Sequence, residues 1–226
     1  MRAVVTGASR GIGHATAIAL AKRGVRLALV GRRSAAMEST IAEVRRLGGI
    51  AEIVPCDLAS SGEIAAAGRE VLRTLGAPSV VVNNAGVIHR TSVENTTDEA
   101  WNEQLDVNLR APFQLTRAFL PAMKAAKTGR FVHVASISAT LGAKNAAAYS
   151  ASKWGLVGFM KSLAEELTDT GLMTMALLPG SVDTQMLEGS GFSARMTAAD
   201  VAKTIAYYSL DAPLSHNGGV VEMFGV

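Results

Sequence analysis

Cysteine is almost absent from this chain of 226 residues, which contains a single one, Cys56. A lone cysteine excludes an intramolecular disulfide, and Cys56 has neither a CxxC partner nor a nearby histidine cluster to suggest a metal or redox site. We therefore expect a protein of a reducing compartment, in which Cys56 is a small buried side chain and no metal is bound.

Long apolar runs and dense charge are also missing. No run of about 18 or more apolar residues occurs, so no membrane-spanning helix is predicted. The first five residues already read as a strand and leave no room for a signal peptide. Basic residues occur only as pairs such as Arg32-Arg33, and the net charge is +3, which does not favour nucleic-acid binding. We expect a cytoplasmic protein without membrane or nucleic-acid partners.

Strand and helix signals alternate along the whole chain, whose 49% hydrophobic and 18% charged residues are typical of a globular protein. The predicted strands are 3–5, 26–30, 51–55, 80–82, 131–134, 173–178 and 220–224. The predicted helices are 14–23, 34–47, 61–75, 98–109 joined to 111–126 by a bend near Pro112, 149–169 and 197–210. This alternation predicts an α/β fold: one Rossmann-type domain over residues 1–226, with a doubly wound seven-stranded parallel sheet and helices on both faces.

A glycine-rich turn lies between the first predicted strand and the first helix, with the spacing Gly7-x3-Gly11-x-Gly13. Glycines at this position let the backbone approach a pyrophosphate and aim a helix N-terminus at it. The alternative is a tight strand-to-helix connection without a ligand. Because the turn belongs to the first βα unit of the chain, we favour phosphate binding.

Tyr149 and Lys153 lie four residues apart at the start of a predicted helix, so they share one face. An ammonium about 4 Å from the phenol would lower the pKa of Tyr149 from its ordinary value near 10 to about 7, within the useful range for proton transfer. Ser136 is predicted at the carboxyl end of the preceding strand, where open α/β sheets bind ligands. The alternative is a surface lysine and a half-buried tyrosine on an amphipathic helix.

Several motifs occur in a fixed order. They are Thr6-Gly7-x3-Gly11-Ile12-Gly13, Asn83-Asn84-Ala85-Gly86, Asn108, Ser136 with Tyr149-x3-Lys153, and Pro179-Gly180-Ser181-Val182-Asp183-Thr184. Together they resemble the short-chain dehydrogenase/reductase family over nearly the whole chain, and within it the 3-oxoacyl-carrier-protein reductases.

The resemblance implies a role for each residue of the catalytic set. Tyr149 would exchange a proton with the substrate oxygen, Ser136 would hold that oxygen, and Lys153 would lower the Tyr149 pKa and bind the nicotinamide ribose. Asn108 would hold a water that links Lys153 to solvent. Two alternatives remain: Asn108 could only bend its helix, and Ser138 could replace Ser136.

The resemblance also implies which positions contact the cofactor. They are Gly7, Ser9, Arg10, Gly11, Ile12, Gly13, Arg32, Arg33, Asp57, Leu58, Asn84, Ala85, Gly86, Tyr149, Lys153, Pro179, Gly180, Val182 and Thr184. Asp57 and Leu58, after the third strand, are expected at the adenine edge.

The end of the second strand indicates which nicotinamide cofactor is used. NAD-binding proteins place a carboxylate there, about 20 residues beyond the turn. This chain has Gly31-Arg32-Arg33 instead, and Arg10 supplies another cation nearby. Because guanidinium groups bind a 2′-phosphate, we predict NADP, although Arg32 and Arg33 could be solvated loop charges.

We therefore predict an NADP(H)-dependent oxidoreductase that acts on a carbonyl/secondary-alcohol pair. The alternatives are an NAD-linked alcohol dehydrogenase and a non-catalytic NADP(H)-sensing protein. The motifs are shared by reductases of ketoacyl thioesters, sugars, steroids and small ketones, so they do not name the substrate. We expect a homodimer or homotetramer, a mobile lid at 185–195, an exposed loop at His89 and Arg90, and a hydrogen-bonded core histidine at His133.

Overall fold

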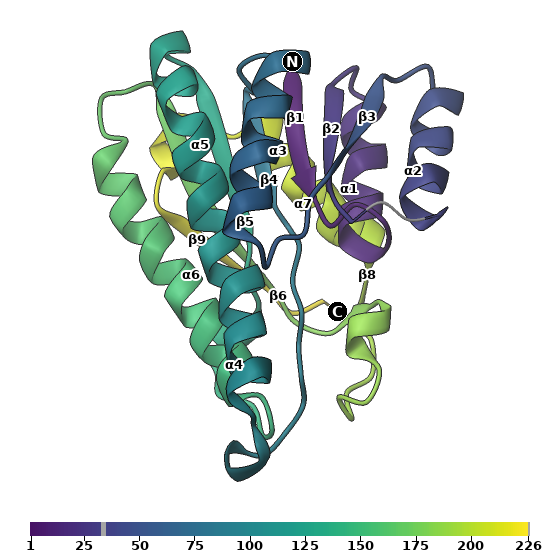
Figure 1. The fold of residues 1–226 in the computed structure, drawn as a ribbon, viewed down its shortest axis with the longest axis vertical. Helices are drawn as coiled ribbons and strands as arrows, with labels where there is room; N and C mark the ends of the chain where they lie inside the picture. The colour runs from purple at the N-terminus through teal and green to yellow at the C-terminus, as the bar shows by residue number, and fades with distance from the viewer. Residues whose placement is uncertain (33–34, 226) are drawn as a thin grey trace.

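The computed structural model describes residues 1–32 and 35–225 and contains the predicted seven-stranded parallel sheet (Figure 1). The strand order is β3-β2-β1-β4-β5-β6-β9. The strands are β1 Arg2–Thr6, β2 Arg26–Gly31, β3 Ala51–Pro55, β4 Val80–Asn83, β5 Gly129–Val134, β6 Leu172–Pro179 and β9 Gly219–Met223. All seven predicted strands are confirmed, with ends that differ by a few residues.

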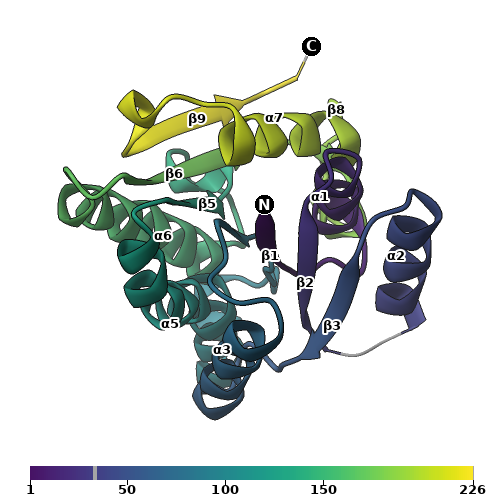
Figure 2. The same cartoon turned by 90° about the horizontal axis from the view of Figure 1, so that it is seen from above.

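Helices cover both faces of the sheet, as predicted, and Figure 2 shows the two layers from above. One layer consists of α1 Gly11–Ala21, α2 Ala35–Arg46 and α7 Ala198–Leu210. The other consists of α3 Ser61–Thr74, α5 Ala111–Ala126 and α6 Ala147–Glu166, while α4 Asp98–Leu105 extends past the carboxyl ends of the strands. Among the described residues, no helix is long and apolar enough to cross a membrane.

The core forms on both sides of the sheet because successive side chains of a strand point to opposite faces. On β5, Val132 and Val134 belong to the cluster that contains α1 and α7 side chains, whereas Phe131 belongs to the cluster that contains α3 and α5 side chains. The strands are near-continuous apolar runs, as expected of a parallel sheet that is buried on both faces. The two helical layers cover these faces.

The bend predicted near Pro112 begins earlier. A π-helical turn, Asp106–Arg110, separates α4 from α5, and Pro112 lies in the first turn of α5. Pro112 has no N–H to donate to the carbonyl four residues before it, which belongs to Asn108. The ordinary helical hydrogen bond is therefore lost at Asn108, and the wider turn accommodates the defect.

A small element that the sequence did not predict lies beyond β6. Strands β7 Val182–Asp183 and β8 Met196–Thr197 pair in parallel and close the segment 184–195 at its base. Each strand has two residues, too few for a periodic signal. The segment between them begins with a 3₁₀ turn, Gln185–Leu187; further 3₁₀ turns are Val93–Asn95, Ile137–Ala139 and Leu214–His216.

Candidate functional site

The strand order reverses between β1 and β4, which lie side by side in the middle of the sheet. Open α/β sheets bind ligands at such a reversal, outside the carboxyl ends of the strands. The glycine-rich turn follows β1 at this point, and the Asn84-Ala85-Gly86 segment follows β4. Two of the predicted motifs therefore meet at the edge where a ligand is expected.

The glycine turn packs so closely on its neighbours that side chains are excluded. A Cβ on Gly13 would lie 2.3 Å from the Gly7 carbonyl oxygen, and a Cβ on Gly7 would lie 2.9 Å from the Cα of Ala85. Gly7 also has a φ of +67°, which favours glycine. The turn thus presents bare backbone.

The N-terminus of α1 is open at this turn. Arg10 is its N-cap residue and makes no side-chain capping hydrogen bond. The first N–H groups of a helix need external acceptors, and together with the helix dipole they form a binding site for anions. An uncapped helix beside a glycine turn is therefore suited to a phosphate group.

Hydrogen bonds from Thr6 and Asn84 fix the two motifs relative to each other. The buried Thr6 Oγ1 accepts from the backbone N–H groups of Asn84 and Ala85, each at 2.9 Å. The Asn84 Nδ2 donates to the carbonyl oxygens of Thr6 at 2.9 Å and Gly7 at 3.3 Å. Asn84 therefore ties the segment after β4 to the end of β1.

The structure brings Ser136, Tyr149 and Lys153 together at the carboxyl end of β5. Ser136 follows that strand, and its side chain interacts with the Tyr149 phenol. The Lys153 Nζ donates to the Val134 carbonyl oxygen at 2.9 Å and lies 5.7 Å from the centre of the Tyr149 ring. Ser138, the alternative to Ser136, donates its backbone N–H to the Ser136 Oγ at 3.1 Å.

The pKa values of the pair differ from the sequence-based expectation. Burial raises the pKa of Tyr149, and the opposing influences come from the Ser136 side chain and the Arg90 charge, not from Lys153. Burial also lowers the pKa of Lys153 to about 8. The predicted fall of the Tyr149 pKa toward 7 does not occur in this structure, because desolvation by burial is the largest influence on both groups.

Asn108 connects the loop after β4 to α6 through hydrogen bonds of its side-chain amide. Its Oδ1 accepts from Val87 N–H at 2.8 Å, and its Nδ2 donates to the Val87 carbonyl oxygen at 2.9 Å and to Ser152 Oγ at 3.0 Å. The Ser152 hydroxyl in turn donates to the Tyr149 carbonyl oxygen at 2.7 Å. Sequence reasoning missed Ser152, which links the π-helical turn to α6.

His133 is a buried core histidine, as expected, but only one of its two ring nitrogens is hydrogen-bonded. Its Nδ1 pairs with the Asn83 side chain at 3.2 Å, but its Nε2 has no hydrogen-bond partner among the described residues. Burial, with a smaller contribution from Lys153, lowers the pKa of His133 to about 3. The ring is therefore neutral, and the Asn83–His133 pair joins β4 to β5.

The segment 184–195, which we call the lid, contacts the site through two arginines. Arg10 hydrogen-bonds the Gln185 side chain, and the Nη2 of Arg90 donates to the Met186 carbonyl oxygen at 2.9 Å. The Met186 methyl group lies within 3.9 Å of the point where a Cβ of Gly86 would be, and Lys153 Nζ lies within 3.5 Å of the same point. The lid therefore approaches Gly86 from the side where the predicted catalytic lysine lies.

The remaining predicted positions surround this centre. Thr184 packs on the glycine turn, with its Cγ2 at 3.1 Å from a Cβ built on Gly11. The Gly180 N–H donates to the carbonyl oxygen of Met223 in β9, and Val182 is buried in the core. Ser9 is half-buried, and Ile12, in the first turn of α1, packs against the core.

The residues expected near the adenosine end are less closely joined to the centre. Arg32 is exposed after β2, and Arg33 lies outside the described residues. The Asp57 Oδ1 accepts from Ala59 N–H in a local turn, and Leu58 is buried. Among the described residues, Arg32, Asp57 and Leu58 make no hydrogen bond or ion pair with the catalytic set, which is consistent with the length of a dinucleotide.

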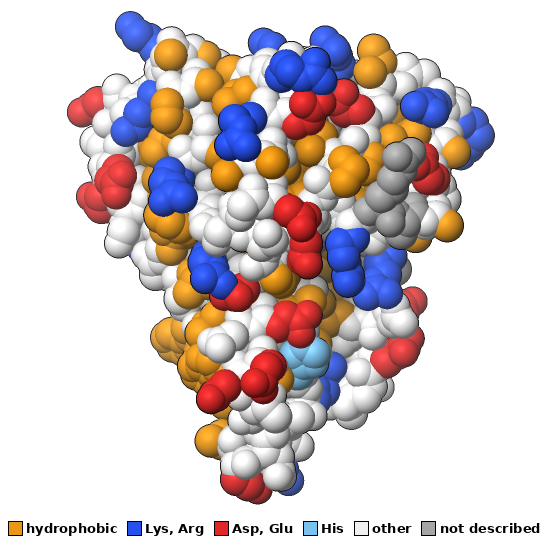
Figure 3. All heavy atoms as spheres, in the orientation of Figure 1, with side chains coloured by type: hydrophobic (Ala, Val, Ile, Leu, Met, Phe, Trp, Pro, Cys, Tyr) orange, Lys and Arg blue, Asp and Glu red, His pale blue; other side chains and the backbone are white. Residues whose placement is uncertain are grey.

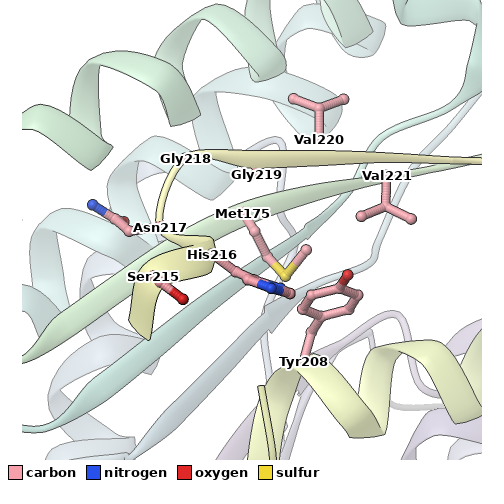
Figure 4. A pocket seen from close by; sticks show the side chains of 9 residues that line it. All are labelled: Met175, Tyr208, Ser215, His216, Asn217, Gly218, Gly219, Val220 and Val221. Atoms are coloured by element: carbon pink, nitrogen blue, oxygen red, sulfur yellow. The ribbon is translucent and has the colours of Figure 1, made fainter. Parts of the chain in front are cut away.

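The described residues enclose hollows at the lid and beside β9. One of about 480 Å³ is lined by lid residues, including Thr184, Gln185 and Phe192. The other, of about 250 Å³, lies where the amino end of β9 pairs with the middle of β6, and it contains none of the predicted site residues (Figure 4). Within residues 1–32 and 35–225, no group of three or more His, Cys, Asp or Glu side chains could hold a metal ion.

The buried Lys153 makes a stability prediction possible. Burial of its charge penalises the folded state below pH 8, since the pKa is lowered from 10.5 to about 8. This difference corresponds to about 3 kcal/mol. Between these pH values the unfolded chain binds more protons, so the wild type becomes more stable relative to Lys153→Met as the pH rises. At pH 7, we expect Lys153→Met to be the more stable protein.

Urea denaturation of the wild type and of Lys153→Met at pH 7 and pH 10 measures this effect, with Lys161→Met as the control because Lys161 is exposed on the same helix. A Lys153→Met protein that is less stable at pH 7, with the same difference at pH 10, would contradict the prediction.

A family model described as short chain dehydrogenase matches residues 1–192. A 3-oxoacyl-[acyl-carrier-protein] reductase from Synechocystis sp. is 36% identical over 187 residues, which cover 82% of this chain and 76% of that protein.

Solved structures agree along the whole chain. A metagenomic short-chain oxidoreductase, described as a complex with NADP, has a TM-score of 0.89 and 36% identity and covers 100% of this chain and 97% of its own. A putative NAD(P)-dependent gluconate 5-dehydrogenase from Beutenbergia cavernae, described with bound NADP, has a TM-score of 0.92 and 34% identity, with coverages of 99% and 95%. The motifs, the fold and these matches show that the chain belongs to the short-chain dehydrogenase/reductase family.

Proposed function

We propose that this protein is an NADP(H)-dependent oxidoreductase that interconverts a carbonyl group and a secondary alcohol, with Tyr149 as the general acid and base. The observation that carries the proposal is the meeting of Ser136, Tyr149 and Lys153 at one sheet edge with the uncapped N-terminus of α1. Relatives and structural neighbours in the same family support it, because their names describe reductases, dehydrogenases and NADP complexes.

The residues at this edge fit a dinucleotide. The bare glycine turn and the free N–H groups of α1 would hold the pyrophosphate. Arg32 would bind the 2′-phosphate, and Lys153 would bind the nicotinamide ribose. When bound, the nicotinamide supplies or accepts the hydride, which is the part of the chemistry that side chains cannot perform.

The chain's own residues supply the proton and its orientation. Burial keeps the Tyr149 phenol protonated at neutral pH, so it can donate to the oxygen of a carbonyl substrate during reduction. Ser136 would hold the same oxygen and position it for this transfer. Asn108 and Ser152 would keep the π-helical turn and α6 in register, so that Tyr149 and Lys153 remain aligned.

The proposal is tested by adding NADPH and a panel of carbonyl compounds to the purified protein: ketoacyl thioesters, keto sugars, steroids and small ketones. We expect consumption of NADPH with at least one class. Consumption of NADH in preference to NADPH would favour the NAD-linked alternative. Tight NADPH binding without turnover of any compound would favour the sensing protein.

The surface of α4, α5 and α6 supports a prediction about assembly. Trp101, Phe113 and Trp154 are 38%, 42% and 54% exposed, and hydrophobic side chains follow the side of the molecule where α5 and α6 lie (Figure 3). Leu163 of α6 does not belong to this surface, because it is buried in the core against the sheet.

We propose that this surface forms the interface of a dimer or tetramer with C₂ or D₂ symmetry. Light scattering at micromolar concentration should give twice or four times the chain mass, and Trp154→Glu should reduce it. A monodisperse wild-type monomer would refute the prediction.

A further inference from the structure

Arg90 is a half-buried cation that the proposed chemistry leaves without a role. It lies in the loop that follows β4, four residues after Gly86. Its guanidinium donates through Nη2 to the carbonyl oxygen of Met186, the lid residue whose methyl group lies near Gly86 and Lys153. Arg90 thus lies between the lid and the catalytic set, and its charge lowers the pKa of Tyr149 against the larger effect of burial.

No carboxylate neutralises this guanidinium among the described residues. Its neighbour His89 pairs with Glu103 at 2.7 Å, and the other ion pairs join residues elsewhere in the chain. The Met186 carbonyl uses one of the five N–H donors of a guanidinium. Arg90 therefore keeps N–H donors that could bind a carboxylate or phosphate group in a bidentate manner, at a place between the lid and the catalytic set.

We propose that Arg90 binds an anionic group of the substrate, so that the preferred substrates are carbonyl compounds carrying a carboxylate or a phosphate. The inference rests on the proposed function and adds the substrate class to it. A carboxylate or phosphate oxygen would take the free N–H groups of Arg90, while the Met186 contact keeps the guanidinium against the lid. The substrate carbonyl would then lie toward Ser136 and Tyr149.

The competing interpretation is that Arg90 only fastens the lid to the loop after β4. A fastening residue affects every substrate to a similar extent, whereas an anion-binding residue affects charged substrates alone. The distinguishing quantity is therefore the ratio of kcat/KM between an anionic substrate and a neutral analogue of the same shape.

The experiment measures kcat/KM with NADPH for matched pairs. One arm uses 4-oxopentanoate, 5-oxohexanoate and 6-oxoheptanoate, each beside its amide. The other arm uses hydroxyacetone phosphate beside hydroxyacetone, which separates a phosphate from a carboxylate. The N-acetylcysteamine thioester of 3-oxobutanoate serves as a neutral thioester probe. Each is assayed with the wild type, Arg90→Ala and Arg90→Lys.

Arg26→Ala is the matched control. Arg26 is exposed at the amino end of β2, whereas the site lies at the carboxyl ends of the strands, and its loss changes the net charge equally. We expect the wild type to favour the anionic member of at least one pair by about 10-fold or more, the scale of a charge-assisted hydrogen bond. Arg90→Ala should bring that ratio close to one, Arg90→Lys should keep part of it, and Arg26→Ala should leave it unchanged.

Equal losses for both members of every pair in Arg90→Ala would overturn the proposal and leave Arg90 as a lid contact. A wild type that prefers the neutral thioester or the amides would overturn it as well. Failure of the proposed function has a different signature, because the wild type would then turn over no member of any pair, whereas failure of the anion site leaves neutral substrates active.

Discussion

Replacing Tyr149 by phenylalanine is expected to lower kcat for NADPH-dependent carbonyl reduction by at least about 100-fold, the scale of general acid catalysis. The variant keeps the buried ring but loses the hydroxyl that interacts with Ser136. Lys153, which donates a hydrogen bond to the Val134 carbonyl oxygen, stays in place in the variant, so the comparison isolates the hydroxyl. NADPH binding should survive, because the glycine turn and α1 do not depend on the phenol.

Steady-state kinetics and NADPH titration of the variant give the two quantities separately. Tyr208→Phe is the control, because Tyr208 lines the hollow where β9 pairs with β6 (Figure 4). A near-normal kcat in Tyr149→Phe would remove Tyr149 from the role of proton donor.

The second large effect concerns cofactor selectivity. Arg32→Ala should raise the NADPH dissociation constant by about 10- to 150-fold, because a charge-assisted hydrogen bond to a phosphate contributes roughly 1.5–3 kcal/mol. Arg32 is exposed after β2, where no acidic residue precedes it, and is free to approach a ligand from solvent. NADH binding should barely change, since NADH lacks the 2′-phosphate.

We expect Arg10 to contribute less to binding of the 2′-phosphate than the sequence suggested. It hydrogen-bonds the Gln185 side chain, so it would have to leave the lid to reach a 2′-phosphate. Arg32 is therefore the better single test. Gly31→Asp should weaken NADPH further, because a carboxylate there repels the phosphate and accepts from a ribose hydroxyl.

Fluorescence titrations with both cofactors decide this prediction, with Arg46→Ala as the control for a lost surface charge. Equal weakening of NADPH and NADH in Arg32→Ala would mean that Arg32 only supports the fold. A wild type that already binds NADH more tightly would overturn the NADP assignment.

The sheet and most helices were predictable because their signals are local. A run such as Phe131-Val132-His133-Val134 marks a buried strand by itself, and Gly24 or Gly48 marks where a helix pattern stops. Thr197 and Asp200 form a capping box at the start of α7, at the spacing that marks a helix N-terminus in a sequence. The meeting of Ser136 with Tyr149 was also predictable, because one follows a strand and the other begins the next helix.

Other features depend on neighbours that are distant in the sequence. The π-helical turn at Asp106–Arg110 arises from the missing Pro112 N–H together with the hydrogen bonds of Asn108 to Val87 and Ser152. The raised pKa of Tyr149 follows from burial, which the spacing of Tyr149 and Lys153 does not reveal. The contact of Arg90 with Met186 joins residues 96 positions apart.

The most direct measurement follows a deuterium label from the nicotinamide carbon of NADPH into the product of a carbonyl substrate, detected by mass spectrometry. We expect one deuterium at the carbinol carbon of the alcohol formed by the wild type, and at least about 100-fold slower labelling with Tyr149→Phe. Binding of labelled NADPH with no label in any product, across the full carbonyl panel, would contradict the assignment of this chain as an oxidoreductase.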